Sequence, residues 1–222
     1  MITIIPEHYL ILNTLFLFVF FILNSLSLKH NLPKINISFL IFVLLINTLI
    51  LAVCDLTIGN LYFNNLFLKL NYQHIISILL IVMSSLILIP INKFNSNYKI
   101  NTFEYYIILL ISIIALYLLL SAQELISFYF LIEIQSISFY ILASYNKLNK
   151  NSIESGIKYF VLSTLSSIFI LIGFAIIYSV SGLISFTDIS IFFIDNYSNT
   201  VIVYISLLAI TSSFLFKLYV AP

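Results

Sequence analysis

The sequence predicts an all-α membrane protein with about seven transmembrane helices. Of its 222 residues, 62% are hydrophobic and 8% are charged, whereas a soluble domain carries about 25% charged residues. So few charged residues leave too little polar surface to cover a soluble globule. The apolar residues also gather in seven runs, each close to the roughly 20 residues that a helix needs to cross a bilayer. Composition and run length therefore agree on the fold class.

The seven runs follow one another without a linker that would divide the chain. They cover residues 9–28, 35–54, 75–90, 103–120, 125–145, 155–180 and 200–220. The first three runs form one predicted region, residues 1–102, and the last four form a second, residues 103–222. The connection 181–199 contains apolar residues but is too polar to span, so it predicts a short interfacial helix or a hairpin.

Lysines are distributed unevenly between the connections. The first, third and fifth connections hold Lys29, Lys34, Lys93, Lys99, Lys147 and Lys150. The opposite ends of the runs hold mostly acids: Glu7, Asp55, Lys69, Glu124, Asp188 and Asp195. Lysine-rich connections stay on the cytoplasmic or matrix side. We therefore expect the odd-numbered connections on that side and the N-terminus on the other.

Residue content argues against several kinds of function. A formal net charge of +1 offers no basic surface to nucleic acid. The single Cys54 excludes an intramolecular disulfide and a multi-cysteine metal site. The three histidines lie at the ends of runs without metal-ligand spacing, and there is no glycine-rich phosphate loop. We expect neither cofactor nor metal in this chain, and we expect membrane lipids around it.

Glu133 lies in the middle of the run 125–145. A carboxylate at the centre of a bilayer costs about 2.5–3.5 kcal/mol on insertion scales, so such a residue usually has a partner or a function. At helical spacing, Tyr129, Ser136 and Tyr140 share its face of the helix. This face is predicted to point toward protein or water. The alternative is a carboxylate that only fixes helix packing through hydrogen bonds.

Two lysines in other runs are further candidates. Lys217 lies late in the run 200–220, where it is either a functional residue inside the membrane or a side chain that extends to the interface. Lys158 lies one turn inside the run 155–180. The alternative there is an interfacial anchor that pairs with Glu154 at i,i+4 spacing.

Glu133 and Lys217 together offer a route for a proton. Each charge stabilises the other at low dielectric constant, and separating them favours transfer of the proton from the amine to the acid. Water and serine hydroxyls are expected to complete the route, and the candidates are Ser136, Ser138, Ser212 and Ser213.

The run 155–180 also carries a stripe of small residues. Gly156, Ser163, Ser167 and Gly173 follow one another at spacings that place them along one side of a helix. Small residues let two membrane helices approach closely. The stripe therefore predicts close packing against a neighbouring helix and not a ligand site.

Three segments resemble the antiporter-like membrane subunits of respiratory complex I, and most of all their subunit 2 branch. They read QELISFYFLIEIQSISFY at 123–140, ESGIKYFVLSTLSS at 154–167 and FLFKLYVAP at 214–222. The order and spacing of the three make the resemblance fairly specific for the C-terminal part of the chain. The first four runs match the family only in number and length.

The resemblance implies a fold and a function. The family has fourteen helices in two inverted repeats, so this chain would be the N-terminal half and would end at the break of the seventh helix near Pro222. Glu133 and Lys217 would form the pair thought to drive proton translocation, with Lys158 as a third proton-transfer residue. The chain would then be a subunit of a proton-translocating NADH:ubiquinone reductase whose redox chemistry takes place in other subunits.

The resemblance also implies partners, because the second repeat does not occur in this sequence. The expected partners are the C-terminal half of the same subunit on a separate chain, and other membrane-arm subunits. The absence of arginine and tryptophan indicates an AT-rich genome, and with the resemblance it predicts the mitochondrial inner membrane, with the N-terminus on the intermembrane-space side. Two alternatives stay open: a cation/proton antiporter subunit, and a structural membrane subunit with an inert half-site.

Overall fold

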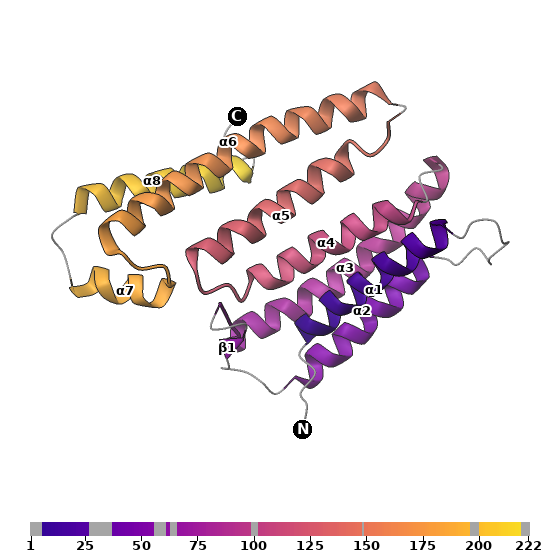
Figure 1. Ribbon diagram of the computed structural model, residues 1–222, viewed down its shortest axis with the longest axis horizontal. Coiled ribbons are helices and arrows are strands. Elements are labelled where there is room, and N and C mark those ends of the chain that lie inside the picture. Colours follow the sequence, from indigo (N-terminus) through magenta and orange to yellow (C-terminus); the bar gives the residue numbers. More distant parts are fainter. Residues whose placement is uncertain are drawn as a thin grey trace. The chain divides into compact units, whose positions relative to one another are not determined.

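The computed structural model describes residues 6–26, 37–55, 61–62, 66–98, 102–147, 149–195 and 200–218. Within these ranges the chain forms eight α-helices and two short strands (Figure 1). In chain order they are α1 (Pro6–Leu26), α2 (Ile37–Cys54), β1 (Leu61–Tyr62), β2 (Phe67–Leu68), α3 (Asn71–Tyr98), α4 (Phe103–Leu119), α5 (Leu125–Ala143), α6 (Lys150–Ser181), α7 (Phe186–Asp195) and α8 (Thr200–Lys217). Seven of these helices coincide with the seven predicted runs, which confirms the fold class.

The helices have the length and surface that a bilayer requires. By length and composition, α2, α3, α5 and α6 can each cross a membrane, and α1, α4 and α8 contain shorter apolar segments. Large apolar side chains are exposed along all seven helices, among them Phe16 in α1, Ile75 in α3 and Leu208 in α8. Such surfaces are stable against lipid, where no polar cover is needed.

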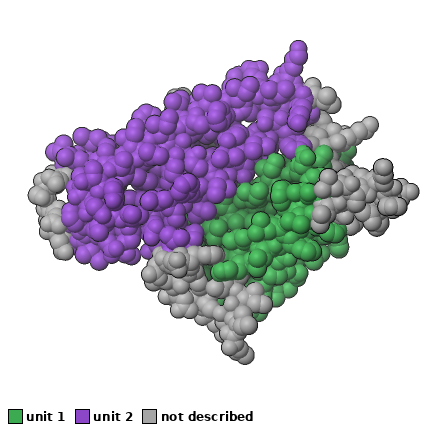
Figure 2. All heavy atoms as spheres, viewed as in Figure 1, with its two compact units in different colours: residues 1–61, 68–121 green, residues 62–67, 122–222 purple. Residues whose placement is uncertain are grey.

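The described chain divides into two compact units (Figure 2). Unit 1 consists of residues 1–61 and 68–121, and unit 2 of residues 62–67 and 122–222. By this division α4 belongs to the compact unit of α1, α2 and α3. The region boundary predicted between residues 102 and 103 stays a prediction.

Unit 1 is a bundle of α1 to α4 around an aliphatic core. α1 packs on α2 and α4, and α2 packs on α3. One leucine or isoleucine from each helix is at most 1% exposed: Leu10, Leu45, Ile81 and Leu110. Phe21 of α1 stacks on Phe103 of α4 with their ring centroids 5.6 Å apart. These contacts come from the apolar runs themselves.

One end of unit 1 contains three charged side chains. The Nζ atom of Lys69, which follows β2, lies 2.7 Å from Oδ2 of Asp55 and 3.4 Å from Oε1 of Glu7. All three side chains are almost completely buried, at 3%, 4% and 6% exposed. The sequence placed them at the same end of the helices, which the structure confirms, but it did not predict this contact. We call these three residues the Lys69 cluster.

α3 is longer than the predicted run, which ended at Pro90. The helix passes through Pro90 and continues to Tyr98. Proline removes one backbone hydrogen bond, but membrane helices tolerate it where neighbouring groups compensate. Beyond Pro90 the helix contacts α4: Asn92 accepts a hydrogen bond of 2.8 Å from the Tyr106 hydroxyl. The predicted connection from residue 91 is therefore wrong as far as Tyr98.

In unit 2, α6 lies between α5 and α8 and packs against both (Figure 1). It begins at Lys150, earlier than predicted, because the Asn149 side chain accepts a hydrogen bond from the backbone of Asn151 at its N-terminus. It ends at Gly182, whose φ of 69° is the left-handed conformation that glycine adopts without strain.

The connection after α6 forms a helix and not a hairpin. α7 starts after Ser185, whose hydroxyl oxygen accepts a hydrogen bond of 3.2 Å from the Asp188 backbone. Ile189 of this helix packs with Leu125 of α5 and Ile177 of α6 in one buried cluster. The short helix expected in the connection 181–199 is therefore present. Part of this connection, like Lys29, Lys34, Lys99 and Pro222 of the sequence predictions, lies outside the described residues.

The small-residue stripe of α6 is a packing surface, as predicted. A Cβ atom at Gly156 would lie 2.4 Å from Cβ of Ser144, at the end of α5. A Cβ atom at Gly173 would lie 2.4 Å from Cγ1 of Ile210 and 3.0 Å from the backbone oxygen of Ser206, both in α8. Only glycine permits these two approaches.

We predict that Gly173→Val weakens the packing of α6 on α8 by about 1–3 kcal/mol, because the new side chain meets atoms that cannot move far. The change is measured as a loss of unfolding free energy in detergent or lipid. Ala175→Val is the matched control, because Ala175 is exposed on the same helix. Equal stability of the two variants would contradict the predicted contact.

Candidate functional site

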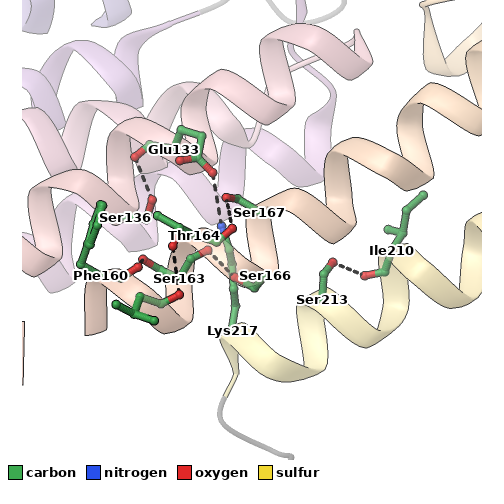
Figure 3. A network of polar contacts seen from close by, with 11 residues as sticks. Glu133, Ser136, Phe160, Ser163, Thr164, Ser166, Ser167, Ile210, Ser213 and Lys217 are labelled. Atoms are coloured by element: carbon green, nitrogen blue, oxygen red, sulfur yellow. Dashed lines mark hydrogen bonds and ion pairs between the residues drawn. The ribbon is translucent and has the colours of Figure 1, made fainter. Parts of the chain in front are cut away.

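The structure brings Glu133 and Lys217 together. Glu133 lies in the middle of α5, and Lys217 is the last residue of α8. Nζ of Lys217 is 4.0 Å from Oε1 of Glu133 (Figure 3). The side chains are 18% and 23% exposed, and the two facing atoms are buried. The pair proposed from sequence is therefore an ion pair between two helices of unit 2.

The pair is not closed by a hydrogen bond. Neither Oε1 of Glu133 nor Nζ of Lys217 has a hydrogen-bond partner in the described part of the chain. Opposite charges 4 Å apart attract by about 4 kcal/mol at an effective dielectric constant near 20. Bringing two charges into a bilayer centre costs about 5–7 kcal/mol on insertion scales. Attraction alone does not cover this cost, so the site needs further polar groups beside the two charges.

α6 supplies polar groups next to the pair. Figure 3 shows Ser163, Thr164, Ser166 and Ser167 of this helix beside Glu133 and Lys217. Ser163, Ser166 and Ser167 are buried. The sequence analysis assigned Ser163 and Ser167 to packing and overlooked Thr164 and Ser166. A hydroxyl residue at nearly every position from 163 to 167 was the signal for a polar surface here.

The serines proposed from sequence divide into two groups. Ser136, Ser138 and Ser213 are buried, whereas Ser212 is exposed. The Ser136 hydroxyl donates to the backbone oxygen of Glu133 at 2.9 Å, and the Ser213 hydroxyl donates to that of Ile210 at 2.6 Å. The α6 hydroxyls donate to their own helix in the same way. Their protons are engaged, but their lone pairs remain available to accept a hydrogen bond.

Two tyrosines complete the surroundings of the acid. Tyr129 and Tyr140 of α5 both interact electrostatically with Glu133. Tyr140 also packs edge-on against Phe160 of α6, with ring centroids 5.1 Å apart. The face predicted for α5 is therefore the face that meets α6 and carries the ion pair.

Lys158 is not part of this site in the structure. Its Nζ atom forms an ion pair of 2.6 Å with Oε1 of Glu154, one turn earlier on α6, and the two side chains are 71% and 63% exposed. This position matches the alternative of an interfacial anchor. A proton-transfer role for Lys158 stays a prediction that needs groups outside the described chain.

The described ranges contain no cluster of metal ligands, because no three His, Cys, Asp or Glu residues of these ranges lie together. A groove of about 520 Å³ between α5 and α6 is lined by apolar side chains and by the tyrosines Tyr129 and Tyr178. The chemistry available at the site is therefore that of a carboxylate, an amine and hydroxyls, which exchange protons.

Comparison with known proteins agrees with this site. Residues 122–222, which contain α5 to α8, match the NADH:quinone oxidoreductase/Mrp antiporter transmembrane family. This part of the chain is similar to that family. It holds Glu133, Lys158 and Lys217, and the resemblance found in the sequence is confirmed.

Relatives of this antiporter-like family extend the match to the rest of the chain. NADH-ubiquinone oxidoreductase chain 2 of Marchantia polymorpha is 30% identical over 227 aligned positions, which include 98% of this chain and 46% of the relative. NADH-quinone oxidoreductase subunit N of Wolbachia is 40% identical over 116 positions, 52% of this chain and 25% of the relative. The chain spans about half the length of relatives such as the Marchantia protein, consistent with the predicted N-terminal half.

Solved structures show the same fold. A chain of the membrane-bound sulfane sulfur reductase, an archaeal respiratory membrane complex, matches with a TM-score of 0.72 over 96% of this chain and 44% of the other, at 17% identity. A chain of respiratory complex I from Thermus thermophilus matches with a TM-score of 0.70 over 96% and 42%, at 18% identity. This chain therefore has the multi-helix membrane fold of these structures.

We predict that Glu133 and Lys217 are energetically coupled. In a double-mutant cycle of Glu133→Gln and Lys217→Met, we expect a coupling energy of about 0.5–3 kcal/mol, because the facing atoms are buried. Lys158 and Glu154 are the control pair. They are closer, but exposed pairs at i,i+4 contribute about 0.3–0.5 kcal/mol. Unfolding free energies in lipid or detergent measure both values, and a larger coupling in the control pair would contradict the prediction.

Proposed function

We propose that this chain is the N-terminal part of a proton-translocating membrane-arm subunit of NADH:ubiquinone oxidoreductase. Proton transfer takes place through the Glu133–Lys217 pair, and a second polypeptide completes the path. The chain itself carries out no redox chemistry. Electron transfer in other subunits of the complex supplies the energy.

The observation that supports this proposal is the open ion pair between α5 and α8. At 4.0 Å the two groups attract each other without sharing a proton. If Lys217 moves slightly closer to Glu133, the two groups form a hydrogen bond and both stay charged. If Lys217 moves slightly away, the neutral acid and the neutral amine are favoured. The pair can therefore load and release a proton with little movement.

The length of the relatives supports a further part of the subunit. The amine lies at the end of α8, and the chain spans 46% of the Marchantia relative. On our proposal, the acceptor of the proton lies on the C-terminal half of the same subunit, and other membrane-arm subunits flank both halves.

We also propose a place in the cell. The relatives include mitochondrial and bacterial forms of the same subunit, and the residue content fits an AT-rich organellar genome. The lysine-rich connections then face the mitochondrial matrix, and the N-terminus faces the intermembrane space. Protease accessibility of the loop after α5, which contains Lys147, tests this orientation in sealed mitochondria and in inverted inner-membrane vesicles.

We predict that Glu133→Gln lowers the ratio of protons pumped to NADH oxidised, because the amide cannot take up the proton of Lys217. Assembly should persist, because glutamine has the same shape. Proton uptake and NADH oxidation are measured together in sealed membrane vesicles. Glu154→Gln is the matched control, since Glu154 is exposed and paired only with Lys158 in the described chain. Its proton ratio should equal that of the parent.

An unchanged proton ratio in Glu133→Gln would contradict the proposal. Lys217→Met provides the second arm of the same test, with the same expected loss of pumping. If both variants assemble and both pump normally, the pair is an inert half-site and the chain is a structural subunit. If the chain is stable and monomeric in a native gel, with no NADH-oxidising assembly, its place in the complex is refuted.

A second candidate function is a subunit of a cation/proton antiporter. The family that matches residues 122–222 includes the Mrp antiporter as well as the oxidoreductase, and the same ion pair can serve both. The two functions differ in their driving force. We predict proton translocation that requires NADH oxidation and is independent of sodium. Sodium-dependent proton exchange in vesicles without NADH oxidation would favour the antiporter.

A further inference from the structure

The lysine-rich end of α6 is a charged surface that the Glu133–Lys217 pair does not use. A hollow of about 360 Å³ on this surface is lined by Lys150, Ile153, Glu154, Ile157 and Lys158. All five of these residues are exposed. The hollow therefore combines charged and apolar groups on one open face of a single helix.

The length of α6 places this surface at the level of the lipid headgroups. A helix of 32 residues is about 48 Å long, whereas the hydrocarbon core of a bilayer is about 30 Å thick. The ends of α6 therefore extend into the headgroup layers. Lys158 and Glu154 form an exposed ion pair near the N-terminal end, and exposed charges are unfavourable in hydrocarbon. The first turns of the helix thus lie among lipid headgroups.

Positive charge exceeds negative charge at this end of α6. Three lysines occur there, Lys147, Lys150 and Lys158, and the one acid among the residues described between 145 and 160 is Glu154. Glu154 is already paired with Lys158 at 2.6 Å. Lys150 is the first residue of α6, and the first turn contains no acid. The helix dipole adds positive charge at the same end, so an external anion stabilises a lysine at this position.

An apolar strip runs beside the lysines. Ile153, Ile157 and Val161 follow one another at i,i+4 spacing, so they lie along one side of the helix. Their side chains are 40%, 60% and 48% exposed. The side chain of Lys158 extends back along the helix to Glu154, which keeps its ammonium near the headgroup end. This face therefore offers cations at its outer end and an apolar strip toward the membrane centre.

We propose that this hollow binds an anionic phospholipid. The lipid phosphate lies at the ammonium groups of Lys150 and Lys158 and accepts hydrogen bonds from them, and one acyl chain follows the strip from Ile153 to Val161. The phosphate supplies the counter-charge that Lys150 lacks among the described residues. A free phosphate ion fits less well, because it leaves the apolar strip uncovered. The site does not depend on the proposed proton path.

Fluorescence quenching in nanodiscs tests this site, because the chain contains no tryptophan. Ile157→Trp places a single reporter in the hollow, at an exposed position that accepts the larger side chain. The full chain is reconstituted in phosphatidylcholine, and brominated phosphatidylglycerol or brominated phosphatidylcholine is added as the quencher. The lipid fraction that halves the fluorescence should be about fivefold lower for the anionic quencher, because one lysine at a membrane surface contributes about that factor.

Substitutions of neighbouring lysines separate a contact in the hollow from general attraction to a charged membrane. In the reporter chain, Lys150→Gln should reduce the preference for the anionic lipid about fivefold, and Lys150→Arg should retain it because the charge stays. Lys147→Gln is the matched control. Lys147 is also exposed and lies three residues earlier, but it does not line the hollow. Its substitution should leave most of the preference.

Two outcomes would overturn the proposal. Equal quenching by the two lipids in the reporter chain would exclude a preference for anionic lipid and would leave these lysines to an acidic protein surface. An equal loss of preference in Lys147→Gln and Lys150→Gln would show that diffuse attraction explains the effect. Both lysines are exposed, so both variants should fold. The proton pumping tested at Glu133 is a separate measurement, and either result can fail without the other.

Discussion

A charge inside a membrane is stable only beside groups that compensate it, and Glu133 and Lys217 show how this chain meets the constraint. The carboxylate and the ammonium come from different helices and face each other at 4.0 Å with no hydrogen bond between them. Their attraction is of the same order as the cost of placing them there. Because this balance is incomplete, the pair also depends on the polar groups beside it.

The packing of unit 2 maintains this balance. α6 lies between α5 and α8, and two of its glycines let it approach both neighbours. Gly156 lies against the end of α5, and Gly173 lies against α8. At the α7 end, Phe128 of α5 contacts Phe174, Phe186 and Phe214, one from each of the other three helices. The apolar contacts hold the helices in place, and the hydroxyls of α6 provide the polar surface beside the charges.

The same constraint explains the contrast between the three groups of ion pairs. Lys158 and Glu154 are close but exposed, so solvent or headgroups stabilise each charge and the pair contributes little. The Lys69 cluster is fully buried and contains more acid than base. The Glu133–Lys217 pair lies between these extremes. Burial and charge balance, more than distance, distinguish these three groups of charged side chains.

Much of the fold could be read from the sequence, because apolar runs of bilayer length permit little else than helices. The cost of a mid-membrane acid likewise identified Glu133 without any structure. The small residues of α6 predicted close packing, which Gly156 and Gly173 confirm. Periodicity and hydrophobicity are local properties of the chain, and these features depend only on them.

Other features depend on distances between residues far apart in the chain, which a local pattern does not contain. α3 continues through Pro90, and Asn92 beyond it accepts a hydrogen bond from Tyr106 of α4, although proline by itself often ends a helix. The distance between Glu133 and Lys217 depends on how closely α5 and α8 pack on α6. In the sequence, Glu7, Asp55 and Lys69 are each only a charged residue near the end of an apolar run. Only the folding of α1, α2 and the β2 segment onto one another brought them into one buried cluster, because electrostatic interactions depend on distance in space and not along the sequence.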